Sequence, residues 1–378
     1  MTLISIVLGT RPEAIKLAPV ILKFSSSKDF DLRIISTGQH KEMVHQILKL
    51  FDIKPHTDLK IMSEKQTLTH ITCKTINGLE KEFDKYYPDL VIVQGDTSTA
   101  FSAALAAFYR NIPVAHIEAG LRTSNKINPF PEELNRRMIT QIADLHFAPT
   151  KLASDNLKKE GIQKNVYITG NTVIDSLLKI ASSVEHPKIT NMDWENKKII
   201  LVTVHRRENW GRNLEEITFA IKDLAKKRKE VNFLIPMHKN KIVRDKIITE
   251  LSGISNIFLT DSLNYDELVG AIKNCHHVLT DSGGIQEEAP TFGKPVLILR
   301  NNTERQEAIN SGAAKLIGTK RMNILNEVNK ILDDTNLYNK MSKSINPFGD
   351  GHATEKIYNY CEKFLKEKKN FKSQNSLT

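Results

Sequence analysis

The feature that most constrains the fold is an alternation of two patterns along the chain. A short apolar, mostly β-branched run is followed by a loop and then by an amphipathic stretch, as at residues 3–8 and the stretch that begins at Pro12. Apolar residues of that stretch recur at the spacing of one helix face: Ala14, Leu17, Ala18, Ile21 and Leu22. Continuous apolar strands that alternate with helices predict parallel sheets covered on both faces.

The alternation forms two series. Strands of the first are expected at residues 3–8, 32–36, 89–93, 113–117, 145–148 and 166–168, with helices at 41–51, 98–109 and 133–143. Strands of the second are expected at residues 198–204, 232–235, 256–259, 277–280, 295–299 and 315–317. Since a single core rarely grows beyond roughly 250–300 residues, a chain of 378 residues with two series predicts two doubly wound, Rossmann-like α/β domains.

The polar stretch at residues 183–197 is the predicted linker. It divides the chain into an N-terminal domain of residues 1–182 and a C-terminal domain of residues 183–352. A last helix at about 353–369 is predicted to pack back on the first domain.

Composition narrows the class of protein. Hydrophobic residues make up 40% and charged residues 26%, and no apolar run approaches the roughly 18 residues of a membrane span. The apolar start of the chain is too short for a signal peptide, so we expect a cytoplasmic enzyme without a membrane partner. The net charge of +10 comes without zinc-finger spacing or an aromatic–basic signature, which argues against a nucleic-acid partner. Cys73, Cys275 and Cys361 lack metal-ligand spacing, and no metal is expected.

One strand-to-helix corner has the chemistry of a phosphate site. The strand expected to end at Thr280 leads into Ser282, Gly283 and Gly284, where a helix begins. Glycines let a phosphate approach the backbone, and a helix N-terminus offers free N–H groups. The alternative is a helix-capping turn. Neither GxGxxG nor GxxxxGK[ST] occurs, which argues against a dinucleotide cofactor and against P-loop chemistry.

Other residues at strand ends could join this ligand. Arg11 follows the first strand and Arg305 follows the strand at 295–299, where either could contact a diphosphate. Glu288, one helical turn beyond the corner, could accept hydrogen bonds from ribose hydroxyls.

Acidic residues recur at strand ends of the first domain. Asp96 and Glu118 each follow a strand, and Glu132 and Glu133 begin a helix. Carboxyl groups that converge there could transfer protons, although acidic residues at a helix start also simply stabilise the helix. His205 follows the first strand of the second domain and could protonate or stabilise a departing phosphate.

Eight segments together resemble the non-hydrolysing UDP-N-acetylglucosamine 2-epimerases. They occur in the order of that family and cover nearly the whole chain. They are Gly9-Thr-Arg-Pro-Glu-Ala-Ile-Lys16, Gly95-Asp-Thr97, His116-Ile-Glu-Ala-Gly-Leu-Arg122, Pro131-Glu-Glu133, His205-Arg-Arg-Glu208, Thr280-Asp-Ser-Gly-Gly-Ile-Gln-Glu-Glu-Ala-Pro290, Thr303-Glu-Arg305 and Asn346-Pro-Phe-Gly-Asp-Gly351.

The resemblance implies a GT-B-like fold, in which the two domains face each other across a cleft that holds the active site. It also implies a UDP-sugar substrate, neither nicotinamide nor metal, and a homodimer. The positions that match phosphate-binding ones are Arg11, Ser282, Gly283, Gly284 and Arg305, with Glu288 at the ribose. The positions that match those lining the reacting sugar are Lys16, Asp96, Glu118, Glu132 and His205.

Some members of that family bind a second UDP-N-acetylglucosamine as an activator. Gln39, Arg206 and His238 match positions used for it, whereas Glu42 and Lys65 depart from the pattern. The resemblance thus implies a possible activator site that is incomplete in this chain.

The expected reaction is reversible C2 epimerisation of UDP-N-acetylglucosamine, through elimination of UDP to a 2-acetamidoglucal and re-addition, for cell-surface polysaccharide synthesis. The alternatives are a hydrolysing epimerase, a GT-B-type glycosyltransferase, a relative acting on a 2,3-diacetamido sugar and a non-catalytic UDP-sugar-binding protein.

Overall fold

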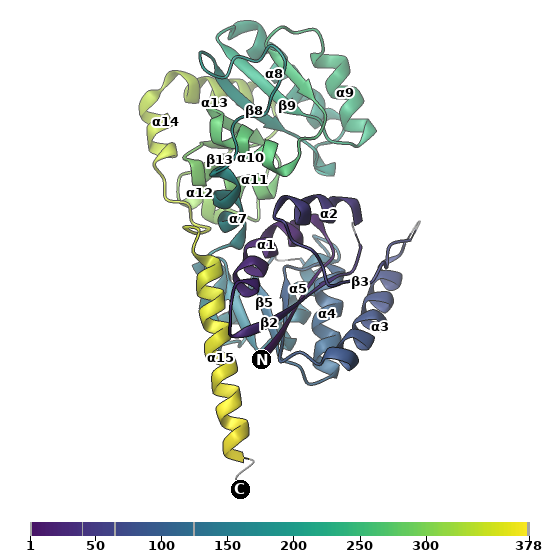
Figure 1. Cartoon of the computed structure of the whole chain (residues 1–378). Coiled ribbons are helices and arrows are strands. Elements are labelled where there is room, and N and C mark those ends of the chain that lie inside the picture. The colour runs from purple at the N-terminus through teal and green to yellow at the C-terminus, as the bar shows by residue number, and fades with distance from the viewer. Residues whose placement is uncertain (1, 40, 64–65, 124, 376–378) are drawn as a thin grey trace. The chain divides into compact units, whose positions relative to one another are not determined.

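The computed structural model describes residues 2–39, 41–63, 66–123 and 125–375. The chain forms two compact units: unit 1 comprises Met1–Ser176 and Phe348–Thr378, and unit 2 comprises Leu177–Pro347. The division lies inside helix α7 (Thr172–Ala181; Figure 1), whereas the sequence placed the domain boundary at the end of that helix. No helix in the described ranges is long and apolar enough to cross a membrane.

Unit 1 is built on a parallel sheet with the strand order β3-β2-β1-β4-β5-β6-β7. Its strands are β1 (Thr2–Leu8), β2 (Phe30–Ser36), β3 (Thr57–Asp58), β4 (Leu90–Gln94), β5 (Val114–Ile117), β6 (Leu145–Ala148) and β7 (Val166–Ile168). Its helices are α1 (Arg11–Ser25), α2 (Lys41–Leu50), α3 (Leu68–Tyr86), α4 (Ser98–Tyr109), α5 (Glu132–Ile142), α6 (Lys151–Lys159) and α15 (Ala353–Asn375), with the first turn of α7.

Unit 2 is built on a second parallel sheet with the order β10-β9-β8-β11-β12-β13. Its strands are β8 (Lys198–Thr203), β9 (Val231–Pro236), β10 (Ile257–Thr260), β11 (His277–Thr280), β12 (Val296–Ile298) and β13 (Ala314–Leu316). Its helices are α8 (Arg212–Lys227), α9 (Lys241–Leu251), α10 (Tyr265–Asn274), α11 (Gly283–Glu288), α12 (Gln306–Asn310), α13 (Arg321–Asp333) and α14 (Thr335–Ser342), with single turns η1 (Arg207–Asn209) and η2 (Ala289–Phe292).

Both sheets confirm the predicted fold class of two doubly wound α/β domains. In each sheet the strand order reverses beside the first strand, between β1 and β4 and between β8 and β11. Ligands of open α/β sheets bind beyond the carboxyl ends of strands at such a reversal. Among the site residues described below, the loops after β4, β8 and β11 carry Asp96, His205, Arg206, Asp281 and Ser282.

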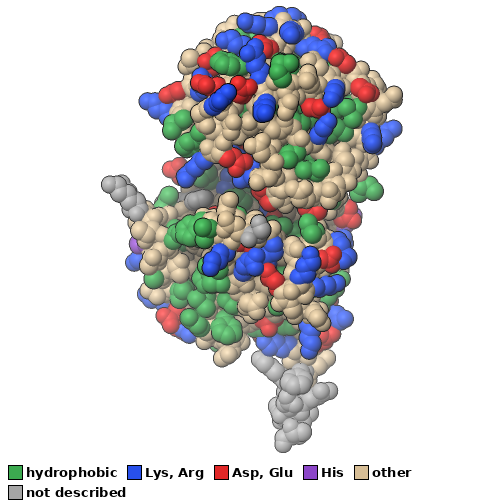
Figure 2. All heavy atoms as spheres, turned by 180° about the vertical axis from the view of Figure 1, so that it is seen from behind, with side chains coloured by type: hydrophobic (Ala, Val, Ile, Leu, Met, Phe, Trp, Pro, Cys, Tyr) green, Lys and Arg blue, Asp and Glu red, His purple; other side chains and the backbone are tan. Residues whose placement is uncertain are grey.

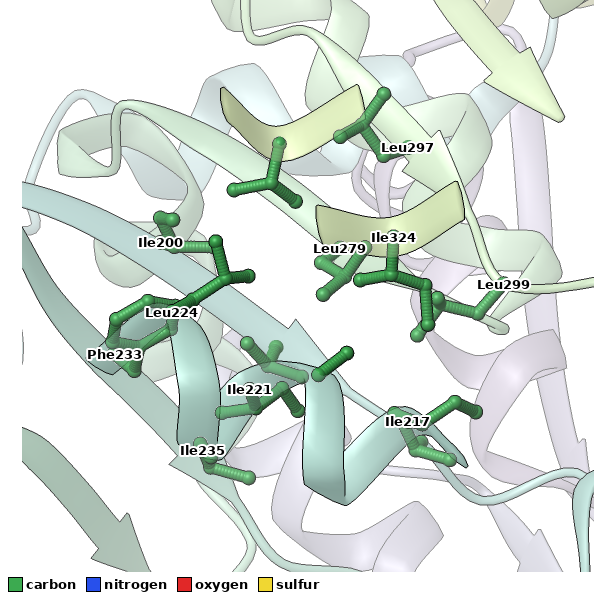
Figure 3. Close-up of a cluster of buried hydrophobic side chains, with 14 of the residues drawn as sticks. Ile200, Ile217, Ile221, Leu224, Phe233, Ile235, Leu279, Leu297, Leu299 and Ile324 are labelled. Atoms are coloured by element: carbon green, nitrogen blue, oxygen red, sulfur yellow. The ribbon is translucent and has the colours of Figure 1, made fainter. Parts of the chain in front are cut away.

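The core of unit 2 shows why its strands are apolar throughout. Ile200, Phe233, Leu279 and Leu297 project from four neighbouring strands toward α8 and α13, where Ile221 is among the residues that meet them (Figure 3). All five are wholly or almost wholly buried. Burial of a side chain of this size contributes roughly 1.5–3 kcal/mol, so this layer fixes the strands whose ends carry the site.

The last helix, α15, packs on unit 1 (Figure 1). The Tyr358 ring lies 5.1 Å from the Phe24 ring and 5.6 Å from the Phe30 ring, measured between centroids. The Asp175 carboxylate accepts hydrogen bonds from the backbone N–H groups of Ala353 and Thr354 at the start of the helix. A carboxylate at a helix N-terminus stabilises it, so α15 is fastened at its first turn as well as along its side.

Basic and acidic side chains are interspersed on the face of the molecule shown in Figure 2. On this face the net positive charge of the chain is therefore not gathered into one basic patch.

Buried histidines make both units sensitive to acid. Burial lowers the pKa of His116 in β5 to about 3 and that of His146 in β6 to about 4. In unit 2, burial lowers the pKa of His276 to about 4 and that of the neighbouring His277 well below its usual value. Between about pH 6.5 and pH 4, the unfolded chain therefore binds protons that the folded chain excludes.

We expect the free energy of unfolding to be highest above about pH 6.5 and to fall as the pH is lowered towards 4. Each buried histidine contributes up to about 1.4 kcal/mol per pH unit to this fall. Urea unfolding between pH 7.5 and 4.5 measures it. His146→Gln should reduce the slope, and the matched change at the exposed His45 should not; equal slopes for both variants would contradict the assignment.

Candidate functional site

Glu118 stands at the carboxyl end of β5 in an unusual backbone conformation. Its φ is +66°, in the left-handed region that residues other than glycine seldom adopt. The peptide groups on either side are tied to neighbouring strands, because Gly95 N–H donates to the Ile117 carbonyl and Ala119 N–H donates to the Phe147 carbonyl, both at 3.0 Å. The strain, of order 1–3 kcal/mol, is thus held by the sheet and aims the side chain from the strand end.

The Glu118 carboxylate is almost fully buried, and side chains from three other residues donate to it. Lys16 Nζ, from α1, forms an ion pair with Oε1. Asn171 Nδ2 donates to the same oxygen at 2.9 Å, and Gln94 Nε2 donates to Oε2 at 2.5 Å. Hydrogen bonds and a cation that favour the charged form stabilise an ionised carboxylate at this position.

Asp96 lies at the end of the neighbouring strand β4 in a different environment. Burial raises the pKa of its carboxyl group, the Arg136 guanidinium at 2.6 Å opposes that rise, and Glu118 and Glu132 add to it. Glu118 and Glu132 therefore lie close enough to Asp96 to act on it electrostatically. A carboxyl group with a raised pKa suits a residue that alternates between its protonated and ionised forms.

Glu132 and Glu133 separate into two roles. Glu133 is completely buried, and it accepts hydrogen bonds from Thr123 N–H at 3.0 Å and from Arg137 Nε at 2.7 Å. It also lies 3.5 Å from Arg136. Glu133 therefore braces the start of α5, whereas Glu132, the first residue of that helix, stays partly exposed and electrostatically coupled to Asp96.

A third buried carboxyl group joins two loops of the site. Glu13 accepts hydrogen bonds from the N–H groups of Gly9 and Thr10 and from the Thr97 hydroxyl. Burial raises its pKa, and those hydrogen bonds oppose the rise. The loop after β1, which leads into Arg11 at the first position of α1, is thereby fixed to the loop after β4, which carries Asp96.

The residue two positions after Glu118, Gly120, must be glycine because a side chain would clash with its neighbours. Its φ is +91°, and a Cβ there would lie 2.2 Å from the Ala153 carbonyl oxygen. A larger residue would push the β5 loop away from α6, and Glu118 with it.

In unit 2, Asp281 organises the loop after β8. Its buried carboxylate accepts hydrogen bonds from the backbone N–H of His205 and of Arg206 and from Asn209 Nδ2, and His205 Nδ1 lies 3.1 Å away. Burial alone would raise the pKa of Asp281, but the hydrogen bonds and charge of His205 hold it below its usual value. The sequence had not assigned this role, although Asp281 stands beside the predicted corner.

The corner at Ser282, Gly283 and Gly284 begins α11 as predicted. A Cβ on Gly284 would meet no atom within 4 Å, so this side of the corner is open. A Cβ on Gly283 would lie 3.3 Å from an Arg206 nitrogen, 3.3 Å from a Glu304 carboxylate oxygen and 3.7 Å from the Arg305 guanidinium carbon. Two cations therefore flank the backbone that the sequence assigned to phosphate.

Acidic partners hold these cations in place. Arg305 Nε donates to Glu287 at 2.7 Å, and Arg206 donates to Glu304 at 3.2 Å. Burial would raise the pKa of Glu304, but Arg305, Arg300 and Arg206 lower it to about 2. Both basic side chains are thus already oriented by carboxyl groups of the same unit.

The remaining predicted residues lie in both units. Glu288, at the end of α11, is buried and lies 3.5 Å from the Tyr265 hydroxyl.

Among the residues matched to an activator site, Gln39 belongs to unit 1, where its amide oxygen accepts a hydrogen bond from Thr99. His238 belongs to unit 2 with Arg206, and its ring stacks on His205 with centroids 5.6 Å apart. Glu42 is exposed in α2, and Lys65 lies outside the described residues.

Within the part of the chain that the structure describes, no group of three or more His, Cys, Asp or Glu side chains is placed to hold a metal ion. The site residues that sequence patterns missed are Gln94, Arg136, Asn171 and Asp281. Each acts on a predicted residue through a hydrogen bond or ion pair.

Comparisons with known proteins agree with this architecture. Residues 22–362 match the profile of the family described as UDP-N-acetylglucosamine 2-epimerase. A UDP-N-acetylglucosamine 2-epimerase of Campylobacter jejuni is 46% identical, over 94% of this chain and 96% of that protein.

Solved structures are similar over the whole chain. The UDP-GlcNAc 2-epimerase of Neisseria meningitidis bound to UDP-GlcNAc has a TM-score of 0.88 and 43% identity, covering 96% of this chain and 100% of that one. The enzyme of Methanocaldococcus jannaschii in complex with UDP-GlcNAc and UDP has a TM-score of 0.78 and 32% identity, covering 96% and 99%.

Proposed function

The chain belongs to the UDP-N-acetylglucosamine 2-epimerase family, and from that premise we propose that it interconverts UDP-N-acetylglucosamine and UDP-N-acetylmannosamine without net release of UDP. The observation that carries the proposal is the pair of carboxyl groups at the ends of neighbouring strands. Asp96 has a raised pKa, and Glu118 is held by Lys16.

Inversion at carbon 2 requires proton transfer on both faces of the sugar. The carbon-2 hydrogen is not next to a carbonyl group, so direct removal would be slow. In the proposed route, the C1–O bond breaks with its electron pair leaving on UDP, a carboxylate takes the carbon-2 proton, and a C1=C2 double bond forms. A second acid then protonates the opposite face of carbon 2 as UDP adds back to carbon 1.

The different environments of the carboxyl groups suit this division of labour. One group must be ionised when the other is protonated, and neighbouring carboxyl groups with different surroundings meet that requirement. We propose Asp96, Glu118 and Glu132 as the acid–base set, without assigning an order.

Unit 2 supplies what the departing UDP needs. We propose that the diphosphate binds at Ser282, Gly283 and Gly284, where Arg206 and Arg305 are already oriented. Preformed cations and N–H groups stabilise developing negative charge without reorganisation during the reaction. His205, whose ring is fixed by Asp281, is the proposed donor to the leaving phosphate.

Two further proposals, on the oligomeric state and on a second ligand, rest on membership of the family. We propose that the protein forms a homodimer, and that Gln39, Arg206 and His238 are the residues that would contact a second UDP-sugar.

Turnover in D₂O tests the elimination route. Purified protein incubated with UDP-N-acetylglucosamine alone should yield the manno epimer with deuterium at carbon 2, because the acid that protonates the opposite face carries a deuteron taken from the solvent. NMR spectroscopy detects both the epimer and the label. Product without deuterium would contradict elimination, and accumulation of free N-acetylmannosamine with UDP would indicate a hydrolysing enzyme.

A further inference from the structure

We infer that Asn171 is a positioning residue for Glu118, so that its side-chain amide sets the orientation and the ionisation of that carboxylate during the reaction. The inference rests on the proposed function, because it assigns a role within the same proton-transfer site. It concerns a residue at the start of α7 that precedes the helix by one position.

The orientation of the Asn171 amide is fixed by its own hydrogen bonds. Its Oδ1 accepts a hydrogen bond from the backbone N–H of Val173 at 3.1 Å. The NH₂ group therefore points the other way, and it donates to Glu118 Oε1 at 2.9 Å. Because Asn171 is only 3% exposed, water does not compete freely for either contact.

The backbone of Asn171 is held by a segment distant in sequence. Asn171 N–H donates to the Phe348 carbonyl at 2.7 Å, and Ile174 N–H donates to the Asn171 carbonyl at 3.0 Å. The preceding Gly170 has φ +90°, and a Cβ there would lie 3.3 Å from the Gly349 Cα. Chain on both sides thus fixes the point from which the amide reaches Glu118.

The donors to Glu118 differ in charge, and that difference gives Asn171 its role. Lys16 and Asn171 approach the same oxygen, whereas Gln94 approaches the other. A lysine alone would draw the carboxylate toward itself in a strong ion pair. A neutral donor orients a carboxylate and lowers its basicity less than a second cation would.

Capping of α7 is the competing explanation, and it uses only Oδ1. Aspartate and asparagine are equally good at the start of a helix. Asn171→Asp therefore keeps the acceptor for Val173 but places an acceptor against Glu118 where a donor stood. The substitution separates a capping role from a positioning role.

The test compares wild type, Asn171→Asp and the matched variant Asn165→Asp, a change of the same size at a turn residue with φ +53° outside the site. In Asn171→Asp we expect kcat to fall roughly 10²–10³-fold while KM changes less than about threefold, because a donor to a charged group is lost and a like charge is added. The acid limb of the pH profile should move up by about one unit or more, since two adjacent carboxyl groups share a proton. Asn165→Asp should match wild type in both readouts.

Each outcome decides the inference. A folded Asn171→Asp enzyme with wild-type kcat and pH profile overturns it and leaves the proposed function intact. A wild-type protein that does not epimerise UDP-N-acetylglucosamine overturns both. Should Asn171→Asp fail to fold, Asn171→Ser keeps a capping oxygen but loses the amide NH₂ that donates to Glu118, and its hydroxyl stands on a shorter side chain. Its kcat is then expected to fall roughly 10–100-fold with thermal stability near that of wild type, and an unchanged kcat would overturn the inference.

Discussion

Replacing Asp96 by asparagine is expected to lower kcat by roughly 10²–10⁴-fold, the range usual for removal of a general acid or base. The amide has the shape of the carboxyl group and can still accept a hydrogen bond from Arg136, so we expect the fold to survive. The loss comes from chemistry, because an amide neither takes nor gives a proton at neutral pH. Steady-state kinetics on UDP-N-acetylglucosamine measures it, with circular dichroism to verify folding.

Asp155→Asn provides a matched control in the same unit. Asp155 pairs with Lys151 on the exposed surface of α6, away from β4 and β5. The same chemical change there should leave kcat within about twofold of wild type, since exposed ion pairs contribute little. An Asp96→Asn enzyme as active as this control would remove Asp96 from the acid–base set.

Removing the Asp281 carboxylate should produce the largest loss of stability. In Asp281→Ala, the N–H groups of His205 and Arg206 and the Asn209 amide lose a buried acceptor. Taking one partner from a buried charged network costs roughly 3–5 kcal/mol. Both tryptophans, Trp194 and Trp210, lie in unit 2, so the fluorescence change on urea unfolding reports on that unit.

The loss of stability in Asp281→Ala should depend on pH, and the lowered pKa of Asp281 sets the direction of that dependence. The pKa of Asp281 is lowered on folding, so its contribution is complete above about pH 4 and declines as the pH falls further. The difference between wild type and Asp281→Ala should therefore shrink in strong acid. Asp261→Ala, which breaks an exposed pair with Arg244 in unit 2, should cost less than about 1 kcal/mol. Equal losses for both variants would contradict the role of Asp281.

The sequence predicted which residues stand at the strand ends, because that placement follows from periodicity. Apolar runs mark parallel strands, and the carboxyl ends of parallel strands lie at one edge of a sheet. Asp96 and Glu118 could thus be placed together before any contact was known. The boundaries of α4 and β6 were predicted to the residue for the same reason.

The sequence did not predict the hydrogen bonds and packing contacts that hold these side chains in place. Asn171 reaches Glu118 only because the loop before α7 is held by Phe348, and no local pattern encodes a contact between such distant segments. Glu132 and Glu133 are alike in sequence, and only packing separates the partly exposed residue from the buried one.

One missed element did have a sequence signal. Helix α3 buries Ile71, Thr75, Leu79 and Phe83, which recur every fourth residue. The polar residues between them and Gly78 concealed the repeat. Its existence was predictable from spacing, unlike the support of Glu118.

The discontinuity of unit 1 has a consequence for the order of biosynthesis. Residues 1–176 precede unit 2 in the chain, but unit 1 gains the Phe348 carbonyl and α15 only after all of unit 2 has been made. Unit 2 is continuous and can fold as soon as its own residues have emerged. Unit 1 is therefore completed after unit 2. We expect the hydrogen bond from Asn171 to Glu118 to be among the last native contacts to form.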